Sequence, residues 1–84
     1  MTGVRVKVRL FASLRETVGQ EELTLDVPQG ATAEDVWRAL VEEEPALASR
    51  RRSLMASVNR KYAPFDTPVA EGDEVVFIPP VSGG

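Results

Sequence analysis

The residue types that most often carry protein chemistry are absent from this chain. Its 84 residues include no histidine and no cysteine, which excludes Ser-His and Cys-His nucleophile pairs and the nitrogen and sulfur ligands that hold zinc. The densest acids, Glu42, Glu43 and Glu44, are adjacent near a predicted helix end. This pattern is typical of a solvated helix surface rather than of two catalytic acids in a cleft. We therefore predict that the chain catalyses no reaction alone.

The closing segment, VVFIPPVSGG, offers the clearest chemistry. Pro79 and Pro80 lack backbone N–H donors and hold the chain extended, so a strand cannot continue through them. Residues 79–84 reach at most ~20 Å at roughly 3.3 Å per residue, and the bare Gly83 and Gly84 fit a narrow channel. We predict a flexible tail that presents the Gly84 carboxylate to a partner protein. An inert, frayed end is the alternative.

A carboxylate at Gly84 is a poor electrophile and needs activation, most simply as an acyl adenylate made with ATP. The chain has no glycine-rich loop that could cradle phosphates. Another enzyme would therefore use the ATP, and no cofactor is expected on this chain. Attack of sulfur on the adenylate would leave a thiocarboxylate, so a protein without cysteine could still carry reactive sulfur.

The elements that must position this tail begin with a strand. Residues 4–10 alternate Val or Leu with Arg or Lys, as a strand with one buried face does. Phe11 breaks the alternation because it is apolar on the charged side. Leu14 and Val18, four residues apart and followed by Gly19, predict a short helix that ends on a left-handed residue.

A second strand and a longer helix follow. Residues 23–27 alternate again and stop at a Pro-Gln-Gly turn. Thr32 is a good N-cap, Asp35 stands in the capping-box position, and Pro45 ends the helix. The buried stripe of this helix is predicted to be Val36, Trp37, Leu40 and Val41. At that spacing we expect Trp37 in the core rather than in a ligand platform.

The last third of the chain adds two strands. Residues 54–58 mark the first, and the long loop after it is expected to tuck Tyr62 and Phe65 inward. Residues 75–78 are apolar at every position, which is typical of a central strand covered on both faces. The three arginines at 50–52 predict a solvated turn, with a phosphate site as the alternative.

This order of elements predicts an α+β fold. Pairing the first and last strands in parallel at the centre places the helix in the crossover between them. The result is the β-grasp, or ubiquitin-like, arrangement, a mixed sheet of four to five strands packed on one main helix. We divide the chain into a β-grasp domain, residues 1–78, and the flexible C-terminal tail, residues 79–84.

Composition limits the partners. The chain has 10 Lys+Arg against 13 Asp+Glu, a net charge of -3, which argues against nucleic acid or an anionic membrane bound through bulk charge. No stretch approaches membrane-spanning length, and the N-terminal segment lacks the apolar run of a secretory signal. The absence of cysteine fits a reducing compartment, so we expect a cytoplasmic protein.

Three stretches, VRLFASLRETVG, SVN and GDEVVFIPPVSGG, resemble the small subunit of molybdopterin synthase, the sulfur carrier of molybdenum cofactor biosynthesis. The resemblance implies that a ubiquitin-activating-like adenylyltransferase adenylates Gly84, which then becomes a thiocarboxylate with Gly83 as the slim residue behind it. It also implies a heterotetramer with a large subunit. In the pocket of that subunit, cyclic pyranopterin monophosphate would receive sulfur to form the molybdopterin dithiolene.

The resemblance implies a role for Phe11 as well. If Val75 and Phe77 face the helix, Val76 and Ile78 share the outer face of the sheet with Phe11 and form a patch where the large subunit would dock. The predicted partner contacts are Phe11, Val76, Ile78, Pro79, Pro80, Val81 and Ser82. Ordinary surface exposure is the alternative.

Three other functions remain open. Sulfur carriers of thiamine biosynthesis share the fold and the diglycine, but they are typically shorter and usually lack the double proline. A ubiquitin-like modifier would join Gly84 to lysines of target proteins. A plain interaction module would have an inert tail.

Overall fold

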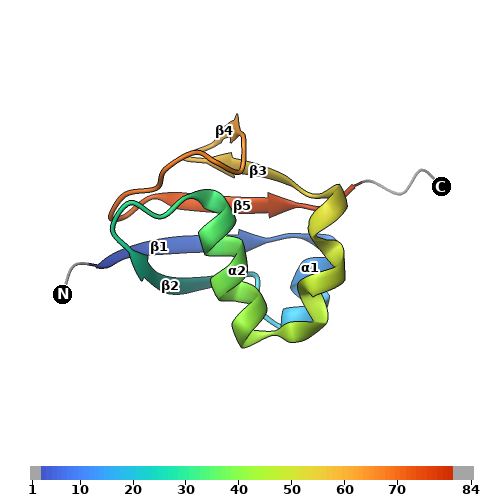
Figure 1. The fold of residues 1–84 in the computed structure, drawn as a ribbon. Coiled ribbons are helices and arrows are strands. Elements are labelled where there is room, and N and C mark those ends of the chain that lie inside the picture. Colours follow the sequence, from blue (N-terminus) through green and yellow to red (C-terminus); the bar gives the residue numbers. More distant parts are fainter. Residues whose placement is uncertain (1–2, 81–84) are drawn as a thin grey trace.

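The structure, a computed structural model, describes residues 3–80. It is a five-stranded sheet with helices packed on one face (Figure 1). The elements in chain order are β1 (Gly3–Leu10), α1 (Ala12–Val18), β2 (Glu22–Pro28), α2 (Ala33–Glu43), the 3₁₀ helix η1 (Pro45–Ser53), β3 (Met55–Val58), β4 (Lys61–Ala63) and β5 (Glu74–Ile78). The strand order across the sheet is β2-β1-β5-β3-β4.

The centre of the sheet is the parallel pair β1 and β5, and every other neighbouring pair is antiparallel. The two ends of the described chain thus meet in adjacent strands, although they are far apart in sequence. Helix α2 lies in the long connection between β2 on one side of this pair and β3 on the other. This topology confirms the predicted β-grasp fold, with five strands.

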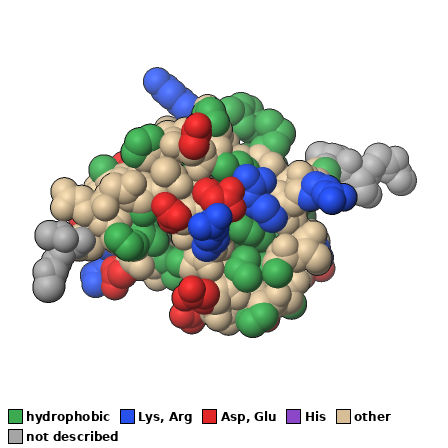
Figure 2. Space-filling view, viewed as in Figure 1, with side chains coloured by type: hydrophobic (Ala, Val, Ile, Leu, Met, Phe, Trp, Pro, Cys, Tyr) green, Lys and Arg blue, Asp and Glu red, His purple; other side chains and the backbone are tan. Residues whose placement is uncertain are grey.

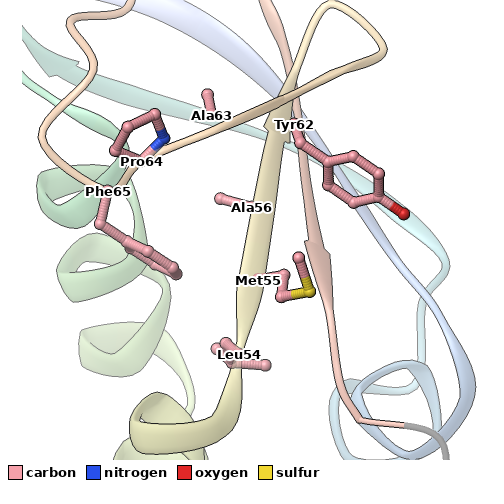
Figure 3. A pocket seen from close by; sticks show the side chains of 7 residues that line it. All are labelled: Leu54, Met55, Ala56, Tyr62, Ala63, Pro64 and Phe65. Atoms are coloured by element: carbon pink, nitrogen blue, oxygen red, sulfur yellow. The ribbon is translucent and has the colours of Figure 1, made fainter.

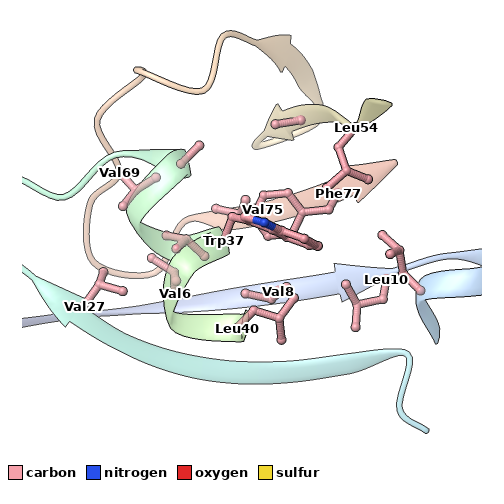
Figure 4. Packing of buried hydrophobic residues seen from close by; sticks show 14 of the residues in the cluster. Val6, Val8, Leu10, Val27, Trp37, Leu40, Leu54, Val69, Val75 and Phe77 are labelled. Atoms are coloured by element: carbon pink, nitrogen blue, oxygen red, sulfur yellow. The ribbon is translucent and has the colours of Figure 1, made fainter. Parts of the chain in front are cut away.

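The inner face of the sheet carries the core. Three side chains of β1 and two of β5 are completely buried: Val6, Val8, Leu10, Val75 and Phe77. The Phe77 ring meets Trp37 edge-on, with ring centroids 5.1 Å apart, and stacks against Phe65 at 6.0 Å. Figure 4 shows Trp37 and Leu40 directed from α2 onto the central strands. The predicted core position of Trp37 is confirmed.

Local signals begin and end the helices as the sequence predicts. The Thr32 hydroxyl accepts a hydrogen bond from the Asp35 N–H at 3.4 Å, and the Asp35 carboxylate accepts one from the Thr32 N–H at 3.0 Å. This reciprocal capping box satisfies two N–H groups that have no partner within the helix. Helix α1 ends at Gly19, whose φ of 84° is left-handed.

One prediction for the segment after β3 is wrong. Tyr62 does not turn inward: it is 72% exposed and belongs to β4, which the sequence pattern concealed within a loop. Asn59 and Arg60 form a two-residue turn, and Tyr62 then pairs with Ser57 on the outward side of β3. Only Phe65 returns to the core, where it packs against the buried cluster.

The arginines at 50–52 also differ from the predicted solvated turn. They lie in η1, and two of them make contacts within the protein. Arg50 donates to the Ser13 hydroxyl at 2.8 Å, while Arg51 donates to the Glu34 carboxylate at 2.6 and 2.9 Å. The Arg51 guanidinium also lies 3.5 Å from the Phe65 ring centroid. Figure 2 shows basic and acidic side chains lying together on this helical side.

The prediction that β5 is a central, largely buried strand is confirmed, but the helices cover only one of its faces. Helix α2 contacts η1, and η1 contacts α1, so the helical segments gather on one side of the sheet (Figure 1). On the other side Val76 is 7% exposed and Ile78 is half-buried. Among residues 3–80, no helix lies on this second side of the sheet (Figure 1).

Candidate functional site

The outer face of the sheet has a hollow that follows β5 from Glu74 to Ile78. Its volume is about 310 Å³. The apolar lining consists of Phe11, Tyr62, Val76 and Ile78. The polar lining consists of Arg9, Ser57, Arg60 and Glu74. The structure therefore brings together the three strand-face residues predicted as partner contacts, Phe11, Val76 and Ile78.

Phe11 reaches this hollow because the chain stays extended one residue beyond β1. Its φ of -125° and ψ of 157° continue the strand conformation, and Ala12 then turns into α1 at a positive φ of 51°. Leu10 is opposite Phe77 in the parallel register, so Phe11 falls beside Ile78. The Phe11 side chain is 43% exposed, whereas its chain neighbour Leu10 is fully buried.

Two further residues of this surface, Met55 and Tyr62, escaped the sequence reading. Among residues 3–80, the exposed large hydrophobic side chains are Phe11, Met55 and Tyr62, and all three lie on this face. Met55 pairs with Ile78 across β3 and β5. Figure 3 shows Met55 and Tyr62 pointing away from the α2 side, opposite Phe65. We call Phe11, Met55, Tyr62, Val76 and Ile78 the outer-face patch.

The patch extends around the β3–β4 edge of the sheet. A second hollow of about 350 Å³ lies there, lined by Met55 and Tyr62 together with Pro64 and the half-buried Phe65 (Figure 3). A signal for Met55 was present in the sequence. Buried residues 54 and 56 alternate with it, so position 55 must point outward.

The rest of the outer face is charged and internally paired. Arg5 donates to Asp26 at 3.1 Å, and Lys7 lies 3.6 Å from Glu22. These pairs join β1 to β2 in the antiparallel register. The hydrogen bond from the Arg5 guanidinium to Asp26 raises the pKa of Arg5, and the negative charge of Asp26 adds to the effect.

The tail follows directly from the patch. Pro79, the first residue after β5, is half-buried, and Pro80 is exposed. The other predicted tail residues, Val81, Ser82, Gly83 and Gly84, lie outside the described residues. The chain therefore leaves the sheet at the apolar end of its outer face, beside Ile78.

Residues 3–80 contain no group of three or more acidic side chains placed to hold a metal ion. No helix among them has the length and apolarity needed to cross a membrane.

Comparison with known proteins gives the chain a family. Residues 8–84 match the sequence profile of the ThiS family. The chain belongs to the ThiS family. This match begins in β1 and extends through the diglycine, so it covers both the sheet and the tail.

Curated relatives are similar over nearly their whole length. A protein of Arabidopsis thaliana named molybdopterin synthase sulfur carrier subunit is 37% identical over 83 residues, covering 99% of this chain and 86% of the relative. An Escherichia coli protein of the same name is 40% identical over 83 residues, covering 94% of this chain and 99% of the relative. The resemblance seen in the sequence is thereby confirmed for this ThiS-family chain.

The fold of this ThiS-family chain also matches solved structures. The crystal structure of small archaeal modifier protein 1 from Haloferax volcanii superposes with a TM-score of 0.86 at 32% identity, covering 93% of this chain and 99% of that protein. The solution structure of small archaeal modifier protein 1 from Methanosarcina acetivorans gives a TM-score of 0.82 at 29% identity over the full length of both chains.

Proposed function

We propose that this ThiS-family protein is a cytoplasmic sulfur carrier of molybdenum cofactor biosynthesis and acts as the small subunit of molybdopterin synthase. One observation carries the proposal: relatives that bear the name molybdopterin synthase sulfur carrier subunit align with nearly the whole chain. The exposed patch beside the start of the tail gives such a subunit a surface on which a partner could dock.

The proposed chemistry takes place at the Gly84 carboxylate. A ubiquitin-activating-like adenylyltransferase joins this carboxylate to the α-phosphate of ATP and releases pyrophosphate. Hydrosulfide, or an equivalent donor of sulfur at the sulfide oxidation level, then attacks the acyl carbon and displaces AMP, which leaves a thiocarboxylate. The chain supplies the carboxylate alone, because it has no thiol of its own. Gly83 leaves room for the reacting group in the partner's channel.

Sulfur delivery is proposed to occur in the large subunit. The thiocarboxylate sulfur attacks a carbon of cyclic pyranopterin monophosphate and displaces the oxygen bound there. Water then cleaves the acyl–sulfur bond, which leaves the sulfur on the pterin and returns the Gly84 carboxylate. Two such transfers form the dithiolene of molybdopterin. Burial of the outer-face patch in a heterotetramer would hold the tail in line with the pocket, with Pro79 and Pro80 restricting its direction.

The decisive experiment follows sulfur on the chain. The full-length protein is incubated with ATP, the activating enzyme and a sulfur donor, and intact mass is measured. We expect the replacement of one oxygen by one sulfur, absent without ATP and absent in a Gly84-deleted variant. A Gly84-deleted protein that still supports molybdopterin formation would refute the proposal.

Docking is tested separately from the chemistry. Phe11→Glu and Ile78→Glu place a charge in a contact that must lose water on binding, so we expect each to weaken association with the large subunit strongly. Thr24→Glu, on the exposed charged half of the same face, is the matched control and should bind normally. Calorimetric affinities that are unchanged in both patch variants would remove the docking role from this surface.

A second candidate function is protein modification. The observation in its favour is the similarity to small archaeal modifier protein 1 at 32% identity. In that case the activated Gly84 carbonyl would be attacked by a lysine amine of a target, forming an isopeptide bond. Lysine-linked adducts recovered from cells would support the modifier, whereas free thiocarboxylate and no adducts would support the carrier.

A further inference from the structure

In the turn between β3 and β4, Arg60 has a backbone conformation that is unfavourable for arginine. Asn59 and Arg60 have φ values of 53° and 72°, the two positive values of a type I′ hairpin turn. That turn strongly favours glycine at its second position, and asparagine tolerates the left-handed region far better than arginine does. Arg60 therefore occupies a site where glycine would relieve strain.

Contacts to β5 keep this turn in place. The Asn59 side chain donates to Asp73 at 3.0 Å and accepts from the Glu74 N–H at 3.0 Å, while the Asn59 N–H donates to the Glu74 carbonyl at 2.8 Å. These three bonds fix the turn against the first residue of β5. A strained residue persists where its surroundings determine the conformation in this way, and such residues concentrate at functional sites.

The turn places Arg60 where positive charge is in excess. The Glu74 carboxylate lies 3.4 Å from Arg60 and 3.8 Å from Arg9, so one negative charge is shared by two guanidinium groups. The Glu74 side chain is 19% exposed and the Arg60 side chain 81% exposed. By contrast, Arg5 and Lys7 each face a separate acid on β2.

This excess charge borders the outer-face patch. Arg9, Arg60 and Glu74 line the same hollow as Phe11 and Tyr62. The Arg9 guanidinium is also 6.0 Å from the centroid of the Phe11 ring. A partner that covers the patch would thus meet two arginines at its border, on a chain whose net charge is -3.

We propose that Arg9 and Arg60 form a cationic rim that binds an aspartate or glutamate side chain of the large subunit. This inference rests on the proposed docking function and names the chemistry of the partner surface: an apolar centre with a carboxylate at the position of the rim. Guanidinium groups suit that role, because their N–H donors match the geometry of a carboxylate. The strained turn is retained because it holds one of the two arginines there.

The test uses a substitution that should stabilise the chain and weaken binding. Arg60→Gly relieves the positive φ, so we expect the Tm to rise by ~4–8 °C for a domain of this size. Affinity for the large subunit should fall about fivefold or more, mainly through slower association, and should lose part of its salt dependence. Arg5→Gln, which removes a paired cation of the same face outside the hollow, should leave affinity unchanged.

A second variant moves binding in the opposite direction. Glu74→Gln removes the internal carboxylate that occupies both arginines and keeps the backbone bonds to Asn59. We expect faster association with the large subunit at low salt and a lower Tm.

The outcomes separate the rim from the docking face. Loss of affinity in Arg60→Gly together with faster association in Glu74→Gln supports the rim. Unchanged affinity and salt dependence in Arg60→Gly would overturn the rim, and the docking face would survive if Phe11→Glu still abolished binding. Normal binding by Phe11→Glu as well would refute the proposed docking face itself.

Discussion

The two faces of the sheet carry the same apolar residue types, but these residues form the core on one face and a surface on the other. In β5, Val75 and Phe77 are completely buried on the side of α2, whereas Val76, 7% exposed, and the half-buried Ile78 lie on the outer face and line its hollow. The inner pair stabilises the fold through close packing. The outer pair lies on the face that the helices leave free (Figure 1). An apolar run in a strand is therefore not evidence of helices on both faces.

The outer face itself is divided. Between β1 and β2, Arg5 and Lys7 each pair with an acid of their own, Asp26 and Glu22. On the β5–β3–β4 side, large apolar groups remain exposed and the acid Glu74 is shared by two arginines. The exposed apolar side chains and the shared acid line one hollow, which follows β5 from Glu74 to Ile78. This combination of features, rather than any one residue, supports the docking role that we propose for this surface.

We expect the largest loss of stability from a substitution on the inner face. Phe77→Ala removes a ring that contacts both Trp37 and Phe65, so we expect a loss of about 3–5 kcal/mol in the free energy of unfolding. Ile78→Ala, its neighbour on the outer face, should cost about 1 kcal/mol or less. Urea denaturation of both variants gives the comparison. Equal losses would mean that the two faces do not differ in their contribution to stability.

The next largest effect is expected on binding, from a substitution on the outer face. Met55→Glu places a charge at a position that is 53% exposed in the free protein, so the Tm should change by no more than a few degrees. Binding should weaken by about 2 kcal/mol, roughly thirtyfold, if Met55 lies in the centre of the contact. Surface plasmon resonance against the large subunit measures this. Full affinity would confine the contact to Phe11, Val76 and Ile78.

A smaller effect concerns the ion pair on the helical side. Glu34 accepts two hydrogen bonds from Arg51, and the two side chains are 28% and 35% exposed. Glu34→Gln should therefore lower the free energy of unfolding by about 1 kcal/mol. Thermal unfolding at two salt concentrations would check it, since partial burial predicts weak screening. If the difference in stability between Glu34→Gln and the unchanged protein disappeared in high salt, the pair would be screened as fully exposed pairs are.

The smallest effect is expected on the charged half of the outer face. Asp26→Asn removes the acid that pairs with Arg5; the Arg5 side chain is 67% exposed and the Asp26 side chain 71% exposed. Ion pairs as exposed as this one contribute little to stability. Neither the Tm nor the affinity for the large subunit should change measurably. Weakened binding would show that the contact reaches across β1 to β2, beyond the outer-face patch.

Much of this architecture could be predicted because its signals are local. The alternation in β1, the capping box at Thr32 and the left-handed Gly19 each depend on residues within one element, and all three are confirmed. The parallel pairing of the first and last strands followed from connection rules. Tyr62 could not be placed in this way. The Asn-Arg turn lacks the glycine that is typical of a two-residue hairpin, so the sequence pattern predicts a loop where β4 lies.

The sequence by itself determined the β-grasp fold, the buried stripe around Trp37 and the outward side of Phe11, because periodicity assigns each side chain to a face regardless of its distant neighbours. Only the tertiary structure decided which outward residues meet. The hairpin places Tyr62 in the same hollow as Val76, and the bonds of Asn59 hold Arg60 near Glu74; both join segments 14 or more residues apart. Such neighbours are set by strand pairing and turn geometry across the whole sheet, which no local pattern in the chain encodes.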